Sequence, residues 1–196
     1  CAMAQSDLKK LVAYSSISHM GFVMLGMAAL TPTGLNGAVL QMFNHGTITA
    51  MLFLLVGVVY DRAHHRDIDG FGGLAKTVPI YSGITCLAFF ASLGLPGLSG
   101  FIGEALVFLG SFAEFPWLVV FSTSGIVITA AYILWTYQRM FLGPLNEKYA
   151  NLSDCNAREV ATLLPLAFFV VVLGVFPQLI IQFFNPTIHS LLEMMK

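Results

Sequence analysis

The 196-residue chain contains few charged residues. Asp, Glu, Lys and Arg together make up 10% of the sequence, whereas soluble domains typically contain about a quarter. Hydrophobic residues make up 57%, and the mean hydropathy is +0.82. A soluble protein of this length could not bury so much apolar surface, and a net charge of -1 gives no basis for binding nucleic acid. The composition therefore predicts an integral membrane protein.

Cysteine is scarce as well, and the common cofactor motifs are missing. Cys1, Cys86 and Cys155 lie far apart without C-x-x-C spacing, so neither a disulfide framework nor a metal site is indicated. The sequence has no dinucleotide-binding glycine fingerprint and no iron–sulfur cysteine array. His64 and His65 lie in a charged loop without a third ligand at useful spacing. We expect no redox centre, cofactor or metal in this chain.

Long apolar runs give the fold class. A bilayer core of about 30 Å needs roughly 20 apolar residues per helix, which predicts an all-α polytopic transmembrane bundle. Residues 7–142 are expected to hold four spans, at 11–30, 35–60, 78–112 and 116–137, and residues 143–159 to form a loop. A final span at 160–184 is followed by a short tail within residues 160–196. Residues 1–6 are expected to end a truncated preceding helix, since the chain starts without a signal-peptide pattern.

Basic residues mark one side of this map. Of the nine Lys and Arg residues, only Lys196 lies after the last span. The others precede the first span, separate the second from the third, or separate the fourth from the fifth. Cytoplasmic loops carry an excess of Lys and Arg, so these segments, including 143–159, are predicted to be cytoplasmic and the tail to lie outside.

A glycine- and proline-rich interruption divides the third span. It contains Gly94, Pro96, Gly97 and Gly100, and Glu104 follows directly. A break in a membrane helix persists only where protein buries it or water lines it. An ionisable group beside it marks an ion or proton path by default. The alternative is that Glu104 caps the half-helix after the break, because anions favour helix N-termini.

Two histidines also lie at membrane depth. His19 shares a helix face with Ser15 and Ser18, and His45 shares one with Gln41 and Thr49. Histidine titrates near physiological pH, so either could pass protons along with water. Polar residues also simply hold membrane helices together. That packing interpretation fits His19 better, and the functional one fits His45 better.

Four segments carry a resemblance to a known family. They are DLKKLVAYSSISHMGF at 7–22, GAVLQMFNHG at 37–46, FGGL at 71–74 and LPGLSGFIGE at 95–104. In this order they resemble the antiporter-like membrane subunits of respiratory complex I, the proton-pumping NADH:quinone oxidoreductase, of the type called M in bacteria and 4 in mitochondria. The resemblance covers essentially the whole chain and weakens after about Gly143.

The resemblance implies a C-terminal fragment of a fourteen-helix subunit built from inverted five-helix repeats. It implies that Glu104 matches the glutamate of the broken twelfth helix, where sister subunits carry lysine. His45 and His19 match the histidines of the eleventh and tenth helices on the proton path. Lys9 matches a lysine near the cytoplasmic surface whose role is less certain.

The function implied is proton translocation through buried Glu, His and water, driven by quinone reduction elsewhere in the complex. FMN, iron–sulfur clusters and quinone are expected in partner subunits. The complex would be a proton-translocating NADH:quinone reductase, and whether this chain by itself is an enzyme stays open. Expected partners are neighbouring antiporter-like subunits and the lipid bilayer, in the bacterial inner membrane or alternatively the mitochondrial one. Other possibilities are a subunit of a multisubunit Na+/H+ antiporter or of a membrane-bound hydrogenase, or a structural scaffold.

Overall fold

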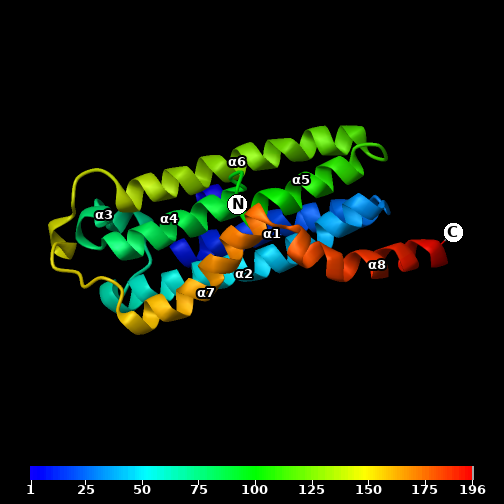
Figure 1. Cartoon of the computed structure of the whole chain (residues 1–196). Helices are drawn as coiled ribbons and strands as arrows, with labels where there is room; N and C mark the ends of the chain where they lie inside the picture. The colour runs from blue at the N-terminus through cyan, green and yellow to red at the C-terminus, as the bar shows by residue number, and fades with distance from the viewer. Residues whose placement is uncertain (196) are drawn as a thin grey trace.

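The computed structural model describes residues 1–195, which form helices and connecting loops without a named strand. Figure 1 shows an elongated bundle whose main helices run roughly along one axis. The elements in chain order are η1 (Ala2–Ala4), α1 (Leu8–Ala28), α2 (Pro32–Ala63), η2 (Ile68–Gly70), α3 (Leu74–Thr77), α4 (Pro79–Leu93), α5 (Ser99–Ser111), α6 (Pro116–Phe141), η3 (Glu147–Tyr149), α7 (Ala157–Val175) and α8 (Gln178–Met194). The predicted all-α class is confirmed.

Four helices of the described chain, α1, α2, α6 and α7, are long and apolar enough to cross a membrane. The fifth predicted crossing, 78–112, is formed by the shorter apolar helices α4 and α5 placed end to end (Figure 1). The expected stub at residues 1–6 contains a 3-10 turn over Ala2–Ala4. The five-span map thus has a helical counterpart for each span.

The break between α4 and α5 is a specific backbone motif. Gly94 has φ +79, the left-handed conformation that favours glycine. The Gly94 N–H donates to Ala91 C=O at 3.2 Å, and the Leu95 N–H donates to Phe90 C=O at 3.0 Å. This pattern satisfies the last carbonyls of α4 as a Schellman motif does. The predicted interruption is present, and the carbonyls of Phe90 and Ala91 at the end of α4 are paired within the protein.

The final span differs from the prediction. One helix at 160–184 with a short tail was expected, but α7 ends at Val175 and α8 begins at Gln178 and continues to Met194. The reason is Pro177, which has no N–H and disfavours the helical conformation at the preceding residue. Phe176 accordingly has φ -124 and ψ 63. The segment expected to be a tail is therefore mostly helical.

Helix α2 packs against α1, α4, α5, α7 and α8, so it forms the centre of the bundle. Its closest approach is to α5, where a Cβ added at Gly37 would lie 2.5 Å from the Val107 backbone nitrogen. Small residues at such a crossing let membrane helices approach closely. The pairing of α2 with α5 brings the polar residues of α2 beside Glu104.

Charged residues tie the helices together at one end of the bundle. Arg62 donates to Glu159 through both terminal nitrogens, at 3.0 and 2.7 Å. Asp154 accepts from the backbone N–H groups of Ile80 and Tyr81 at 2.8 and 2.9 Å. It thereby caps α4, whose own N-cap residue, Val78, makes no side-chain cap bond. The 143–156 loop is thus fixed against α2, α4 and α7.

Cys155 lies within this fixed loop and allows the predicted topology to be tested. Burial raises the pKa of the Cys155 thiol, and the nearby carboxylates of Asp154 and Glu159 add to the rise. In a chain with Cys1→Ser and Cys86→Ser, a membrane-impermeant maleimide should label Cys155 in inverted vesicles and leave it unlabelled in intact cells. Labelling should accelerate as the pH rises above neutral, because the thiolate is the reactive form.

The matched control places a thiol at the opposite end of the helix bundle (Figure 1). Ser190 is exposed on α8, and Ser190→Cys in a Cys155→Ser background should be labelled in intact cells. Rapid labelling of Cys155 from outside would overturn the five-span topology.

Candidate functional site

Glu104 lies in the second turn of α5 and is buried. Its side chain is 7% exposed, and no acidic residue occupies the first turn of α5. The N-cap of this helix, Leu98, makes no side-chain cap bond. Glu104 therefore does not cap the half-helix, and the capping alternative considered for it is not supported.

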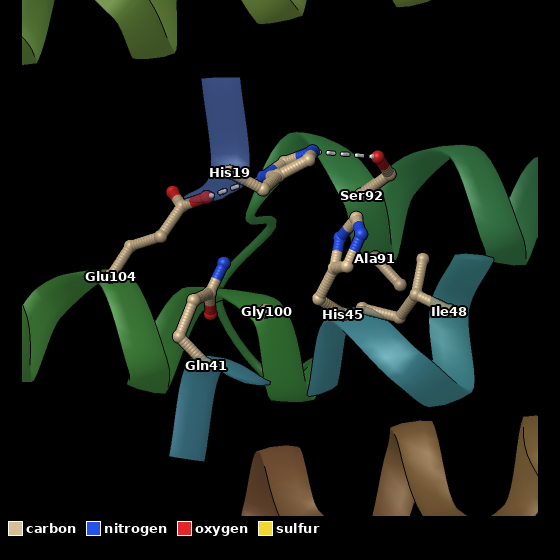
Figure 2. A pocket seen from close by; sticks show the side chains of 8 residues that line it. All are labelled: His19, Gln41, His45, Ile48, Ala91, Ser92, Gly100 and Glu104. Atoms are coloured by element: carbon tan, nitrogen blue, oxygen red, sulfur yellow. Dashed lines mark hydrogen bonds and ion pairs between the residues drawn. The ribbon is translucent and has the colours of Figure 1, made fainter. Parts of the chain in front are cut away.

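His19 of α1 is the partner of this carboxylate. His19 Nδ1 lies 3.4 Å from Glu104 Oε1, and both side chains are almost fully buried. On its other side, His19 Nε2 shares a hydrogen bond with Ser92 Oγ of α4 at 3.3 Å. The contact with Glu104 is at ion-pair distance but too long for a well-formed hydrogen bond. His19 thus connects the acid to the last turn of α4 (Figure 2).

His45 and Gln41 of α2 complete the cluster. The rings of His45 and His19 have centroids 5.5 Å apart, and His45 Nδ1 lies 3.2 Å from Thr49 Oγ1. Within residues 1–195 the buried Gln41 Oε1 has no hydrogen-bond partner. This oxygen lies beside Gly103 of α5, and the Gln41 amide nitrogen points toward His19 and Glu104 (Figure 2).

The cluster surrounds a small polar cavity. Its lining consists of His19, Gln41, His45, Ile48, Ala91, Ser92, Gly100 and Glu104 (Figure 2). About 10 Å³ is open to the centre of a water-sized sphere, which is close to the space that one water molecule needs. A water there would have imidazole, amide, hydroxyl and carboxylate groups within the lining as partners.

The helix break creates the space for this arrangement. A Cβ added at Gly94 would lie 2.9 Å from Glu104 Oε2, so the carboxylate packs directly against the turn. A Cβ at Gly100 would clash with the Ala91 carbonyl at the end of α4. Because Gly94 and Gly100 have no Cβ, the end of α4 and the start of α5 can pack closely together beside the cavity that side chains of α1 and α2 also line.

The structure brings together three of the four residues predicted to carry protons. Glu104, His19 and His45 line one cavity, and Gly100 from the predicted break lines it too. Lys9 is exposed at the start of α1, ten residues or about 15 Å of helix from His19. Sequence reasoning missed Ser92, because a serine in an apolar helix gives no signal until its neighbour across the bundle is known.

Proton transfer is the chemistry that these groups can perform. Glu104, His19 and His45 are titratable, and Ser92 and Thr49 have hydroxyl groups that can both donate and accept. Glu104, His19 and Ser92 form a continuous sequence of polar contacts. His45 makes no direct hydrogen bond to His19 within the described residues, so a water in the cavity would have to connect them.

Comparisons with known proteins agree on one family. The family model described as "NADH:quinone oxidoreductase/Mrp antiporter, TM" matches residues 1–129. NADH-quinone oxidoreductase subunit M of Rhodobacter capsulatus is 45% identical over 193 residues, covering 98% of this chain and 38% of the relative. The chain thus spans less than half the length of this relative.

Solved structures give the same fold. A chain of respiratory complex I from Thermus thermophilus matches with a TM-score of 0.94 at 32% identity, covering all of this chain and 41% of that one. A chain of the Mrp complex from Dietzia sp. DQ12-45-1b matches with a TM-score of 0.88 at 18% identity, covering 97% and 44%. The second likeness concerns the fold alone.

Two glycines of the break provide a matched test of the site geometry. Gly94 and Gly97 both have positive φ, but a Cβ at Gly97 would meet no atom within 4 Å. Gly97→Ala should therefore carry only the backbone strain, about 1 kcal/mol. Gly94→Ala should carry the same strain and also displace Glu104, so its thermal unfolding in detergent should occur at a lower temperature. Equal unfolding temperatures would show that Gly94 does not position the carboxylate.

Proposed function

This chain belongs to the NADH:quinone oxidoreductase/Mrp antiporter transmembrane family, and we propose that it forms part of a proton path through the membrane arm of a complex I type pump. The observation that supports this is the buried contact of Glu104 with His19 beside a broken helix. A carboxylate in the membrane interior is costly in its charged form. Its retention at this depth is explained if it must gain and lose a proton.

The groups around Glu104 fit that role. When His19 is protonated it stabilises the Glu104 carboxylate, and when Glu104 is protonated His19 can be neutral. Each state keeps the buried pair close to charge balance. A proton can thus be exchanged along Ser92, His19 and Glu104 without leaving an isolated buried charge, which would cost several kcal/mol, about 3–5 when one partner of a buried pair is removed.

The choice of protons over sodium rests on the ligands of the cavity. Hard cations are held by several oxygen ligands, whereas this cavity has a single carboxylate, and His19 lies between it and His45 (Figure 2). Imidazole nitrogens can both donate and accept protons, so they suit proton transfer better. This favours the complex I interpretation over an Na+/H+ antiporter subunit.

The energy for transport would come from other chains. We propose that neighbouring antiporter-like subunits continue the path, that redox groups lie in partner subunits, and that the complex is embedded in the bacterial inner membrane. Lys9, far from the cavity, remains a predicted path residue whose connection would require further groups. A purely structural scaffold is disfavoured, because apolar side chains would fill the Glu104 position at lower cost.

Substitutions at Glu104 test the proposal. Glu104→Gln keeps the shape but cannot titrate, so an assembled complex should lose most proton uptake in vesicles. Glu104→Asp should retain part of it. Glu104→Lys should retain activity only if the path accepts a titratable group of either sign. Glu114→Gln, at an exposed acid after α5, is the matched control and should pump normally.

Assembly must be measured beside uptake, so that loss of the complex is not mistaken for loss of transport. Normal pumping by an assembled Glu104→Gln complex would contradict the proposed role and leave the proton path elsewhere.

A further inference from the structure

A groove separate from the polar cavity lies where α1 begins and α2 ends. It is lined by Lys9, Phe53, Val56, Gly57, Tyr60 and Arg66 and has a volume of about 510 Å³, within the range of small-molecule sites. The Leu8 N–H donates to the Arg66 carbonyl at 2.9 Å, which holds the two chain segments together. Both basic residues therefore lie at the same end of the bundle.

The lining of the groove has two chemical parts. Phe53, Val56 and Gly57 belong to an apolar stretch of α2 and give the groove a hydrocarbon wall. Lys9, Arg66 and Tyr60 lie at its charged end. An aromatic ring beside basic residues, next to an apolar helix surface, is typical of the headgroup level of a membrane protein.

Arg66 is held in place but keeps free donors. Its Nε lies 3.2 Å from Asp7 Oδ2, the one carboxylate that forms an ion pair with it among residues 1–195. Its guanidinium carbon lies 5.5 Å from the centroid of the Tyr60 ring. Within residues 1–195 its two terminal nitrogens make no hydrogen bond. A guanidinium fixed in this way can bind a phosphate through two parallel bonds.

Lys9 supplies the second positive charge. It is exposed and forms no ion pair within the described chain. Lys9 and Arg66 are the charged residues that line the groove, and with Asp7, the partner of Arg66, these three residues carry a net charge of +1. Basic pockets between membrane helices on the cytoplasmic side bind anionic lipid headgroups.

We infer that this groove binds an anionic phospholipid, with the phosphate between Lys9 and Arg66 and an acyl chain along Phe53, Val56 and Gly57. The groove shares Lys9 with the residues predicted for the proton path, but its lining is separate from that of the polar cavity around Glu104. The charge complementarity at one end and the apolar wall at the other select a lipid over a free anion, which would leave the wall unused.

Photolabelling of the assembled complex in vesicles tests this site. Vesicles of phosphatidylcholine would contain a photoreactive phosphatidylglycerol or, in a parallel sample, a photoreactive phosphatidylcholine, and labelled peptides from residues 51–66 would be measured by mass spectrometry. Phosphatidylglycerol should label these peptides more strongly. Lys9→Gln should reduce that labelling about fivefold, because a basic residue near the surface contributes about 1 kcal/mol.

Two matched pairs of variants keep the test specific. Lys10→Gln removes the same charge from a neighbour outside the groove and should leave labelling unchanged. Gly57→Leu should block the groove without disturbing the fold, because a Cβ there meets no atom within 4 Å. Gly83→Leu makes the same change at an equally open position on α4 and is its control.

Four outcomes would overturn the inference. Equal labelling by both lipids, or an equal decrease with Lys10→Gln and Gly83→Leu, would show that contact with bulk lipid explains the signal. Displacement by inorganic phosphate alone would identify a free anion as the ligand. Absence of labelling at 51–66 would show that another part of the protein covers this face.

Discussion

The central constraint on this chain is that a carboxylate must lie inside a membrane-spanning bundle without an uncompensated charge. Glu104 meets that constraint through His19, 3.4 Å away on a different helix. The pairing requires α1, α4, α5 and α2 to converge at one level. At this level α2 approaches α5 closely. The same convergence places Ser92, Gln41 and His45 around the cavity beside Glu104.

The interrupted helix is what makes the convergence possible. In a continuous helix the backbone groups would hydrogen-bond within the helix, and side chains would separate its backbone from the neighbouring helices. Gly94 ends α4 in a left-handed turn, and the carboxylate occupies the space that a Cβ would fill. The carbonyls of Phe90 and Ala91 at the end of α4 are paired at the turn, which lowers the cost of a break inside a bilayer. Polar side chains then reach a cavity of about the size of one water molecule.

Much of this arrangement was predictable from sequence. Low charge and long apolar runs predicted the transmembrane helix bundle. The glycines and the proline at 94–100 predicted the interruption of the third span. The importance of Glu104 followed from its depth alone. The contact of His19 with Glu104 could not be predicted, because a helix-face pattern cannot show which residue lies opposite. Ser92, Arg62 and Glu159 depend on contacts between distant segments. The division of the last span at Pro177 was missed because an apolar run hides a proline when only hydropathy is counted.

The central claim is that Glu104 changes protonation during turnover, and infrared difference spectroscopy of the assembled complex measures this directly. The account predicts a carbonyl band of a protonated carboxyl group that changes when turnover is started. The band should be missing in Glu104→Gln, unchanged in Glu114→Gln and shifted in His19→Gln. An identical difference spectrum for the native complex and assembled Glu104→Gln would contradict the account.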